Sequence, residues 1–397
     1  MKKIRMGMVG GGKGAFIGAI HRIAAFMDGD IELICGAFNS NHQHCIESGK
    51  SLYIAEQRCY ATYQDMFKAE AALPEGKRME FVVIVTPNHL HFPVAKMAME
   101  YGFHVLSEKP ATINLNEALK LKKIIAQQNT LYALTHTYTG YPLIKQARHL
   151  VAQGELGNIT KIVVEYSQGW LALKTDENSK QASWRLDESK SGLSCCMGDI
   201  GVHASNLAEY VSGMTITELC ADLTSTVNGR TLDDDGTVLL KFSNGAKGVL
   251  LASQISLGDE NNLKLRIYGD KKSLEWSQLE PNTLWLKSQN QASEMIRAGI
   301  GEMCVAAQQA MRTPAGHPEG YLEAFANIYA NFVQQIRAKK TQLPCDNQYF
   351  DLPGIEEAVR GMAFIENVVK ASISEEKWWP FIIDNELSAG EKQHVSD

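Results

Sequence analysis

The first part of the chain alternates short apolar runs with segments in which apolar residues recur at helical spacing. The run at residues 81–85 has the length and composition of a buried strand, and residues 114–128 follow a helical pattern that Asn114 is suited to cap. The strands expected here are residues 4–9, 31–38, 58–61, 81–85, 103–107 and 132–135. Strands that alternate with helices predict a parallel sheet covered on both faces.

After residue 157 the pattern changes to alternating polar and apolar positions. The strands expected there are residues 159–166, 219–227, 237–242, 248–256, 264–268 and 283–286, with turns such as Ser243-Asn244-Gly245 between them. This predicts a mostly antiparallel sheet with one polar and one covered face. Helices are expected at residues 203–211, 321–337 and 355–372, and the last should pack on one of the two domains. We therefore expect domains at residues 1–150 and 151–384, followed by a polar tail at 385–397.

A glycine-rich turn follows the first predicted strand. Its sequence, Gly10-Gly11-Gly12-Lys13-Gly14-Ala15-Phe16-Ile17-Gly18, leads into a helical pattern. Glycines let the backbone approach a pyrophosphate, whose charge then lies at the amino end of the helix. Two alignments remain open, one ending in Ala15 and one ending in Gly18 with an enlarged loop. The strand before and the helix after favour dinucleotide binding over a merely flexible turn.

Two more core strands end in polar residues at the carboxyl edge of the sheet, where ligands bind in such folds. Thr86-Pro87-Asn88 follows residues 81–85, and its side chains could bond a ribose or an amide, although Asn88 also suits a helix cap. Ser107-Glu108-Lys109-Pro110 follows residues 103–107, and a Glu-Lys pair there is costly unless it has a task or a partner. The alternative is a surface ion pair that ends the strand.

A further pattern, Asp199-x-x-x-His203, places a carboxylate and an imidazole four residues apart. On a helix both lie on one face, and a carboxylate beside a histidine favours proton transfer from a hydroxyl. The alternative is a capping aspartate with a satisfied histidine. His317 lies in a tight turn that could point it into a cleft, and residues 233–236 form an acidic turn that we expect to be solvated.

Composition limits the partners. The 397 residues carry a net charge of −6 without a strongly basic run, which argues against a nucleic-acid surface. No apolar run approaches the ~20 residues that span a bilayer, and the amino terminus lacks the features of a signal peptide. The eight cysteines show neither disulfide nor metal spacing, and no set of zinc ligands is evident, so we expect a reduced, cytoplasmic protein without a metal.

Taken together, the glycine loop, Thr86-Pro87-Asn88, Glu108-Lys109-Pro110 and Asp199-x-x-x-His203 resemble, in this order, the Gfo/Idh/MocA oxidoreductases over roughly residues 1–380. The resemblance implies an α/β fold, with an N-terminal Rossmann domain and a C-terminal α+β domain built on an open, mostly antiparallel sheet. It implies that Lys109 contacts the reacting hydroxyl, that His203 relays its proton and that Asp199 orients the site.

The expected cofactor contacts are Gly10, Gly12, Gly14, Ala15, Phe16, Ile17, Asn39, Ser40, Thr86, Pro87, Asn88, His91, Glu108 and Lys109. The expected substrate contacts are Trp184, Arg185, Asp199, His203 and His317. The second strand is followed by Asn39 and not by the acid that binds a 2′-hydroxyl, and no arginine is placed to hold a 2′-phosphate. The cofactor is therefore NAD or NADP, with NAD favoured.

The chain departs from the family pattern in two places. The glycine loop is about three residues longer than usual, and Asn206 stands where many members carry aspartate. The resemblance implies an NAD(P)-dependent dehydrogenase for a secondary alcohol of a sugar, glycoside or cyclitol, assembled as a homodimer or homotetramer through its C-terminal sheet. The alternatives are a redox-neutral enzyme that keeps NAD bound, for elimination or epimerisation, and a non-catalytic nucleotide-sensing regulator.

Overall fold

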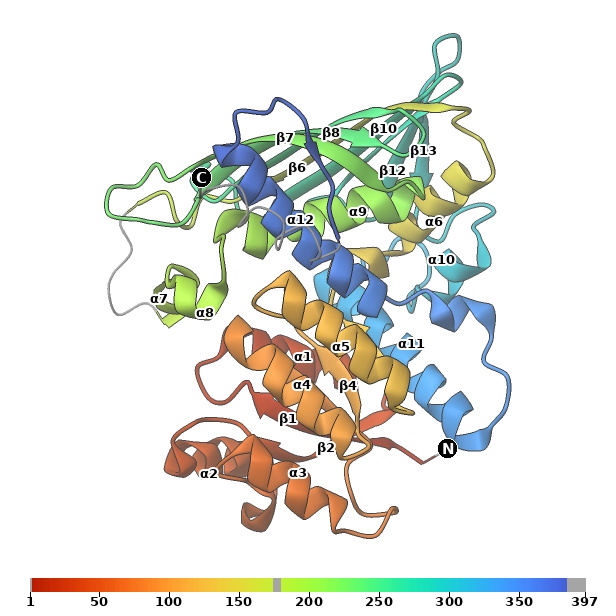
Figure 1. Ribbon diagram of the computed structural model, residues 1–397. Helices are drawn as coiled ribbons and strands as arrows, with labels where there is room; N and C mark the ends of the chain where they lie inside the picture. Colours follow the sequence, from red (N-terminus) through yellow and green to blue (C-terminus); the bar gives the residue numbers. More distant parts are fainter. Residues whose placement is uncertain (1, 174–179, 384–397) are drawn as a thin grey trace.

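The computed structural model describes residues 2–173 and 180–383, in two layers built on separate sheets (Figure 1). The first sheet contains β1 (Ile4–Gly10), β2 (Ile31–Ala37), β3 (Phe81–Val85), β4 (His104–Ser107) and β5 (Tyr132–Leu134). Its strands are all parallel, in the order β2-β1-β3-β4-β5. The connecting helices are α1 (Phe16–Phe26), α2 (His42–Ser51), α3 (Tyr63–Ala71), α4 (His91–Glu100) and α5 (Leu115–Gln127).

Both faces of this sheet are buried, as the unbroken apolar run of β3 predicts. Phe81, Val83 and Val85 pack with α1 and with the later helix α11 (Tyr321–Thr341). The alternate residues Val82 and Ile84 pack with α3, α4 and α5. The predicted helix with its Asn114 cap is confirmed, because the Asn114 side chain accepts a hydrogen bond from the backbone of Glu117 at 2.9 Å.

The second sheet has nine strands in the order β13-β12-β11-β10-β6-β9-β8-β7-β14, antiparallel except for the pair β6–β9. Its strands are β6 (Ile159–Ser167), β7 (Ile216–Thr224), β8 (Asp235–Phe242), β9 (Lys247–Ser253), β10 (Asn262–Gly269), β11 (Ser273–Ser277), β12 (Thr283–Lys287), β13 (Glu294–Arg297) and β14 (Trp379–Pro380). The remaining helices are α6 (Pro142–Ala152), α7 (Lys180–Arg185), α8 (Glu188–Ser191), α9 (Val202–Ser212), α10 (Val305–Gln309) and α12 (Ile355–Ile373).

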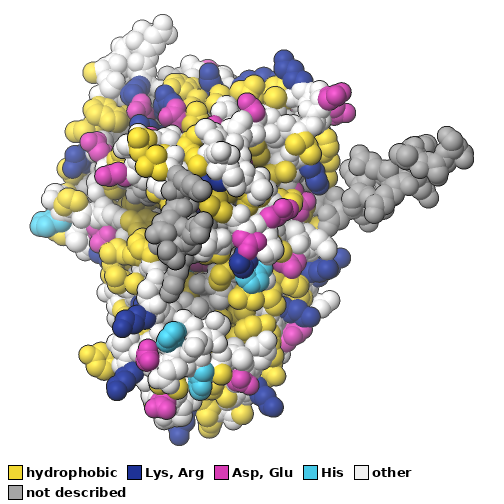
Figure 2. Space-filling model, turned by 90° about the vertical axis from the view of Figure 1, so that its left-hand side faces the viewer, with side chains coloured by type: hydrophobic (Ala, Val, Ile, Leu, Met, Phe, Trp, Pro, Cys, Tyr) yellow, Lys and Arg dark blue, Asp and Glu magenta, His cyan; other side chains and the backbone are white. Residues whose placement is uncertain are grey.

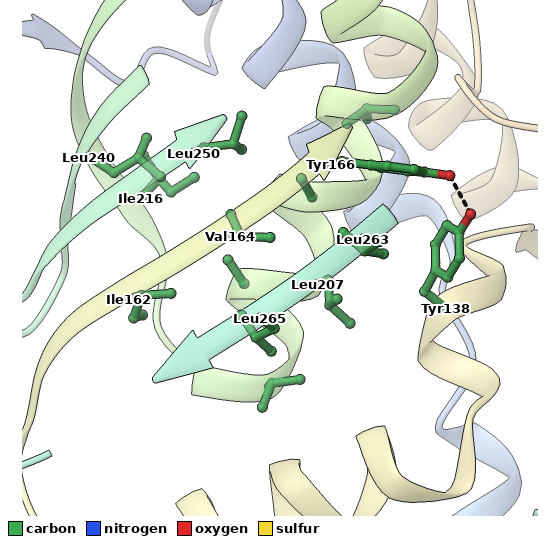
Figure 3. Packing of buried hydrophobic residues seen from close by; sticks show 14 of the residues in the cluster. Tyr138, Ile162, Val164, Tyr166, Leu207, Ile216, Leu240, Leu250, Leu263 and Leu265 are labelled. Atoms are coloured by element: carbon green, nitrogen blue, oxygen red, sulfur yellow. Dashed lines mark hydrogen bonds between the residues drawn. The ribbon is translucent and has the colours of Figure 1, made fainter. Parts of the chain in front are cut away.

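Helices cover the second sheet on one side (Figure 1). There Leu207 of α9 packs against residues of β6 and β10 that include Val164 and Leu265 (Figure 3). The strands therefore alternate buried and accessible positions, as expected for an antiparallel sheet with one covered face. Within the described residues, no helix is long and apolar enough to cross a membrane.

The two long C-terminal helices connect the layers. Helix α11 buries Phe325, Tyr329 and Phe332 against the first sheet, although it follows β6 to β13 of the second sheet in sequence. Helix α12 packs on both β7 and α5, so the expectation that it rests on one domain is wrong. Such contacts between distant segments leave no local pattern in the sequence.

Three further expectations differ from the structure. The strand expected at residues 58–61 is a 3₁₀ turn at Glu56–Arg58 followed by a single bridge between Gly36 and Cys59. The strands β11, β13 and β14 were not expected, because they are too short or too polar to show a pattern. The acidic turn is not solvated, since Asp233 and Asp234 are buried and accept hydrogen bonds from neighbouring backbone amides.

The glycine loop follows the alignment that ends in Gly18. Gly10 has a φ of +82°, and a Cβ there would lie 2.7 Å from the carbonyl oxygen of Val85. Gly18 lies in the first turn of α1, where a Cβ would come within 2.4 Å of Gly11 Cα. The third glycine of such loops permits this close packing of helix on turn. Residues 13–15 therefore form the enlargement.

We predict that Gly18→Ala displaces α1 from the loop, because the added methyl overlaps the backbone of Gly11. NADH affinity, measured by nicotinamide fluorescence, should fall at least about tenfold, on the scale of an overpacking cost of ~1–3 kcal/mol. Gly76→Ala is the matched control, since a Cβ at that exposed glycine meets nothing within 4 Å. Equal affinities of the two variants would contradict the packing role of Gly18.

Candidate active site

Two cavities meet at the carboxyl edge of the first sheet. One, of about 670 Å³, is lined by the glycine loop, the end of β2 and Thr86-Pro87. The other, of about 550 Å³, lies between the two sheets and contains Lys109, Asp199 and His203. They share walls formed by Phe16, Ile17, Val85, Thr86, Trp184 and Arg185. On the face shown in Figure 2, charged side chains of both signs are scattered among apolar ones.

The first cavity fits a dinucleotide. No side chain caps the start of α1, so its first backbone N–H groups remain available to a pyrophosphate. Thr86 Oγ1 is buried and has no hydrogen-bond partner among the described residues, at the wall shared with the second cavity. A ribose or carboxamide group at that position would satisfy it. Asn39 lines the same cavity, with its side-chain oxygen accepting from Asn41 N at 2.9 Å.

Lys109 extends from the end of β4 to the second layer. Its Nζ donates to Asp199 Oδ1 at 2.8 Å and to the Asp199 carbonyl oxygen at 2.6 Å, and its side chain is 13% exposed. The alternative of a surface pair with Glu108 does not occur, because the Glu108 carboxylate is bonded to His21 at 2.8 Å. An ammonium group has three donors. One donor of Lys109 is thus left for a ligand.

Asp199 lies in a π-helical turn, Met197–Gly201, that precedes α9. The buried Asp233 anchors this turn by accepting from Cys195 N at 2.9 Å and Met197 N at 3.0 Å. Burial opposes ionisation of Asp199, but the charges of Lys109 and Arg185 outweigh it and hold the pKa of its carboxyl well below the ordinary value. Gln254 Nε2 donates to Asp199 Oδ2 at 2.9 Å. Asp199 is therefore an ionised group that orients Lys109.

His203 lies in the first turn of α9, directly after this π turn, and lines the cavity. The carboxylate of Asp199, in the π turn, bonds Lys109 and Gln254, so the expected hydrogen-bonded pair with His203 is not formed among the described residues. The Nδ1 atom of His203 instead lies 3.4 Å from Nδ1 of His136, and Tyr138 packs edge-on against its ring at 5.0 Å. Burial, followed by the charge of Lys109, lowers the pKa of His203 well below its usual value. The imidazole is therefore neutral near pH 7 and able to accept a proton.

A polar part of the cavity wall was not foreseen from the sequence. Tyr138 and Tyr166 share a short hydroxyl–hydroxyl contact (Figure 3). Tyr166 donates to Asn261 Oδ1 at 2.7 Å, Gln168 donates to the same atom at 2.8 Å, and Asn261 Nδ2 donates to Tyr138 at 3.2 Å. All four residues line the cavity with Lys109. The network gives this wall fixed hydroxyl and amide groups.

The other predicted site residues are distributed as follows. Asn88 does not cap a helix with its side chain but donates to the carbonyl of Ser191 at 2.9 Å. His91 is buried between the carbonyl oxygens of Pro110 at 2.7 Å and Thr86 at 2.8 Å, so it supports both turns of the cavity edge. Arg185 pairs with Asp199 at 3.3 Å and stacks on the ring of Trp184 at 4.5 Å.

Two residues singled out from the sequence lie elsewhere. His317 is exposed on the turn before α11 and is not among the residues that line either cavity. Its side chain approaches the carbonyl of Pro314, so the turn directs it away from the cleft. Asn206 lines a separate cavity of about 940 Å³ behind α9. Among the described residues, no cluster of His, Cys, Asp and Glu side chains could hold a metal ion.

Comparison with known proteins agrees with this geometry. Residues 4–136 match the model of the oxidoreductase family with an NAD-binding Rossmann fold, and residues 144–275 match the GFO/IDH/MocA C-terminal domain. The chain is 32% identical to the uncharacterized oxidoreductase YfiI of Bacillus subtilis, over 96% of this chain and 97% of that protein.

Solved structures are similar over almost the whole chain. An oxidoreductase from Sinorhizobium meliloti is 40% identical with a TM-score of 0.86, and covers 95% of this chain and 99% of its own. An inositol dehydrogenase homolog from Azotobacter vinelandii, complexed with NAD⁺, is 33% identical with a TM-score of 0.90, and covers 95% and 97%. That homolog was also solved with NADH and myo-inositol. The chain belongs to the Gfo/Idh/MocA family and is an NAD-binding oxidoreductase.

Proposed function

We propose that this protein oxidises a secondary alcohol of a sugar, glycoside or cyclitol, with NAD as the hydride acceptor. The observation that carries the proposal is the position of Lys109. Its ammonium lies in the same cavity as the neutral imidazole of His203, and that cavity shares a wall with the dinucleotide cavity. A proton acceptor and a positive charge are thus available to one alcohol oxygen next to the nicotinamide.

When bound, the nicotinamide supplies an acceptor for the hydride of the alcohol carbon. The remaining donor of Lys109 binds the alcohol oxygen and stabilises the negative charge that develops there. His203 removes the hydroxyl proton. This requires the tautomer in which His203 Nδ1 donates to His136 Nδ1, because Nε2 then has a free lone pair. Burial, followed by the charge of Lys109, lowers the pKa of His136 to about 3, so this partner is also neutral.

The polar part of the cavity wall favours a substrate with many hydroxyl groups. Tyr138, Tyr166, Gln168 and Asn261 present hydroxyl and amide groups that a polyol can bond. Trp170 and Trp184 add aromatic faces suited to the apolar face of a sugar ring. Since a related protein was solved with myo-inositol, cyclitols are the first substrates to test.

The redox-neutral alternative differs only in whether reduced cofactor is released, which turnover experiments decide. The non-catalytic regulator is disfavoured, because Lys109, Asp199 and His203 are all present and line one cavity. A cytoplasmic location is part of the proposal and is supported by the eight cysteines, all of which are unpaired.

The proposal also includes a homo-oligomer formed through the outer face of the second sheet. Cys220, Leu239, Val249 and Val163 are successive partners across β7, β8, β9 and β6, and so form a continuous apolar row. Trp285 and Met295 form another pair farther along the same face, and Met295 is 51% exposed. A second copy of this face would cover these side chains.

We expect a screen of cyclitols, sugars and glycosides with NAD, followed at the NADH absorbance, to identify substrates of the wild-type protein. With the best of them, Lys109→Met should lower kcat at least ~10²-fold, the scale seen when one electrostatic contact to the transition state is lost. NADH binding should change little, whereas the melting temperature should fall, because the buried carboxylate of Asp199 loses its lysine partner. A Lys109→Met variant with normal turnover would refute the catalytic role of the lysine.

The pH dependence provides a second test. The neutral imidazole of His203 is the active form, and its pKa lies below the ordinary histidine value of 6.5. We therefore expect kcat/KM for oxidation to stay level between pH 8 and pH 6.5. The acid limb should appear only below this value. Loss of the Lys109 charge should move the limb upward in the residual activity of Lys109→Met. His203→Ala should lower turnover by ~10²–10⁴ and remove the limb. A wild-type acid limb at or above pH 6.5 would be inconsistent with this base.

The assembly is tested by Leu239→Arg, which places a charge within the apolar row on the outer sheet face. Sedimentation velocity should show the wild type as a dimer or tetramer and the variant in a smaller form. Ile373→Arg is the control, because Ile373 is 83% exposed at the end of α12. If the wild type sediments as a monomer, or Leu239→Arg leaves its size unchanged, this interface is wrong.

A further inference from the structure

His21 is a fully buried histidine that the reaction described above does not use. It lies on α1, the helix that begins at the glycine loop, and none of its surface is exposed. Its Nε2 lies 2.8 Å from Glu108 Oε1, and its Nδ1 lies 2.6 Å from the hydroxyl of Tyr329 on α11. Phe325 of the same helix packs edge-on against the imidazole at 4.7 Å. The ring therefore has a single fixed orientation.

Glu108 joins this histidine to the catalytic lysine. Its Oε1 also accepts from Thr135 Oγ1 at 2.7 Å, while its Oε2 accepts from the backbone N–H of Lys109 at 3.1 Å. The carboxylate is buried, and burial opposes its ionisation, but the hydrogen bond from His21, the charge of Lys109 and the hydrogen bond from Thr135 outweigh this and lower its pKa. An ionised carboxylate only accepts hydrogen bonds, so His21 Nε2 must carry a proton.

The direction of the hydrogen bond between His21 and Tyr329 follows from the proton on Nε2. A neutral imidazole protonated at Nε2 has an acceptor at Nδ1, and the hydroxyl of Tyr329 lies at that atom. Hydrogen bonds then run in one direction, from Tyr329 through His21 to Glu108. Glu108 in turn fixes the backbone of Lys109, whose Nζ is held by Asp199 at the other end. The lysine is thus constrained at both ends, once through its side chain and once through this buried chain of contacts.

We propose that His21 is a positioning residue for Lys109 in the proposed reaction, acting through Glu108, with Tyr329 holding its tautomer. The same helix, α1, carries the dinucleotide loop at its amino end. One rigid element therefore sets both the cofactor cradle and the lysine. Since small displacements of a catalytic group greatly slow a reaction, loss of His21 acts on kcat more than on cofactor binding.

The test compares His21→Leu, which cannot donate, with His21→Gln, whose amide can donate to Glu108 and so replace Nε2–H. We expect kcat to fall at least about tenfold in His21→Leu and to recover to within about threefold of the wild type in His21→Gln. The dissociation constant of NADH, from nicotinamide fluorescence, should change less than about threefold in both. His104→Gln, at the opposite end of β4, is the control and should leave kcat unchanged.

Two further measurements keep the proposal open to refutation. Tyr329→Phe should also lower kcat, by a smaller factor than His21→Leu. If His21→Leu does not fold, the kcat of Tyr329→Phe tests the positioning role in its place. A crystal structure of His21→Leu should show Lys109 Nζ displaced from Asp199, where the wild-type distance is 2.8 Å. The crystal structure needs no substrate. A failed substrate screen would therefore refute the proposed function but leave the positioning role of His21 to be tested by the structure. Normal kcat in His21→Leu, an undisturbed Lys109–Asp199 pair, or equal losses in His21→Leu and His21→Gln would each overturn the positioning role.

Discussion

The ion pair between Lys109 and Asp199 is the interaction on which the site depends. It joins the end of a strand in the first sheet to a turn that follows β6 of the second sheet. Both side chains are largely buried, and breaking such a pair costs about 3–5 kcal/mol because one charge is left without a partner. The pair lies in the wall of the cavity and largely sets the electrostatics there.

Other features of the fold supply what this pair needs. Asp233 holds the π turn in place, and Gln254 satisfies the second oxygen of Asp199. The charge of Lys109 also acts on His203, whose pKa is lowered by burial and then by the nearby ammonium. The proposed proton acceptor and the group proposed to stabilise the alkoxide are thus coupled. A change at the lysine alters both.

Much of this could be predicted because it follows from local rules. Apolar runs gave the parallel strands, and the rule that ligands bind at their carboxyl ends led to Thr86 and Lys109. The same rule applied to β5 would have found His136 and Tyr138, which follow that strand directly. Asp199 and His203 were recognised by spacing, but their relation was not. Asp199 lies in a π turn and its carboxylate bonds the lysine, and no sequence signal marks that turn.

The remaining contacts are long-range and could not be read from the sequence. The hydrogen bond between His21 and Glu108 joins residues 87 positions apart, and the one between His21 and Tyr329 joins residues 308 positions apart. Asn261 and Gln168 come from loops at the ends of strands in a mostly antiparallel sheet, for which no rule ties position to function. His317 illustrates the opposite error, since its turn suggested a cleft but places it on the surface. In each case the packing of α11 or of the second sheet decides the position.

The central claim is that this cavity passes a hydride from an alcohol carbon to NAD. The most direct measurement is a single-turnover reaction with a cyclitol or sugar that carries deuterium on the oxidised carbon. We predict that one equivalent of reduced cofactor forms more slowly than with the unlabelled compound, carries the deuterium, and is released with the ketone product. Product formed without released NADH, or NADH formed without the label, would contradict the account.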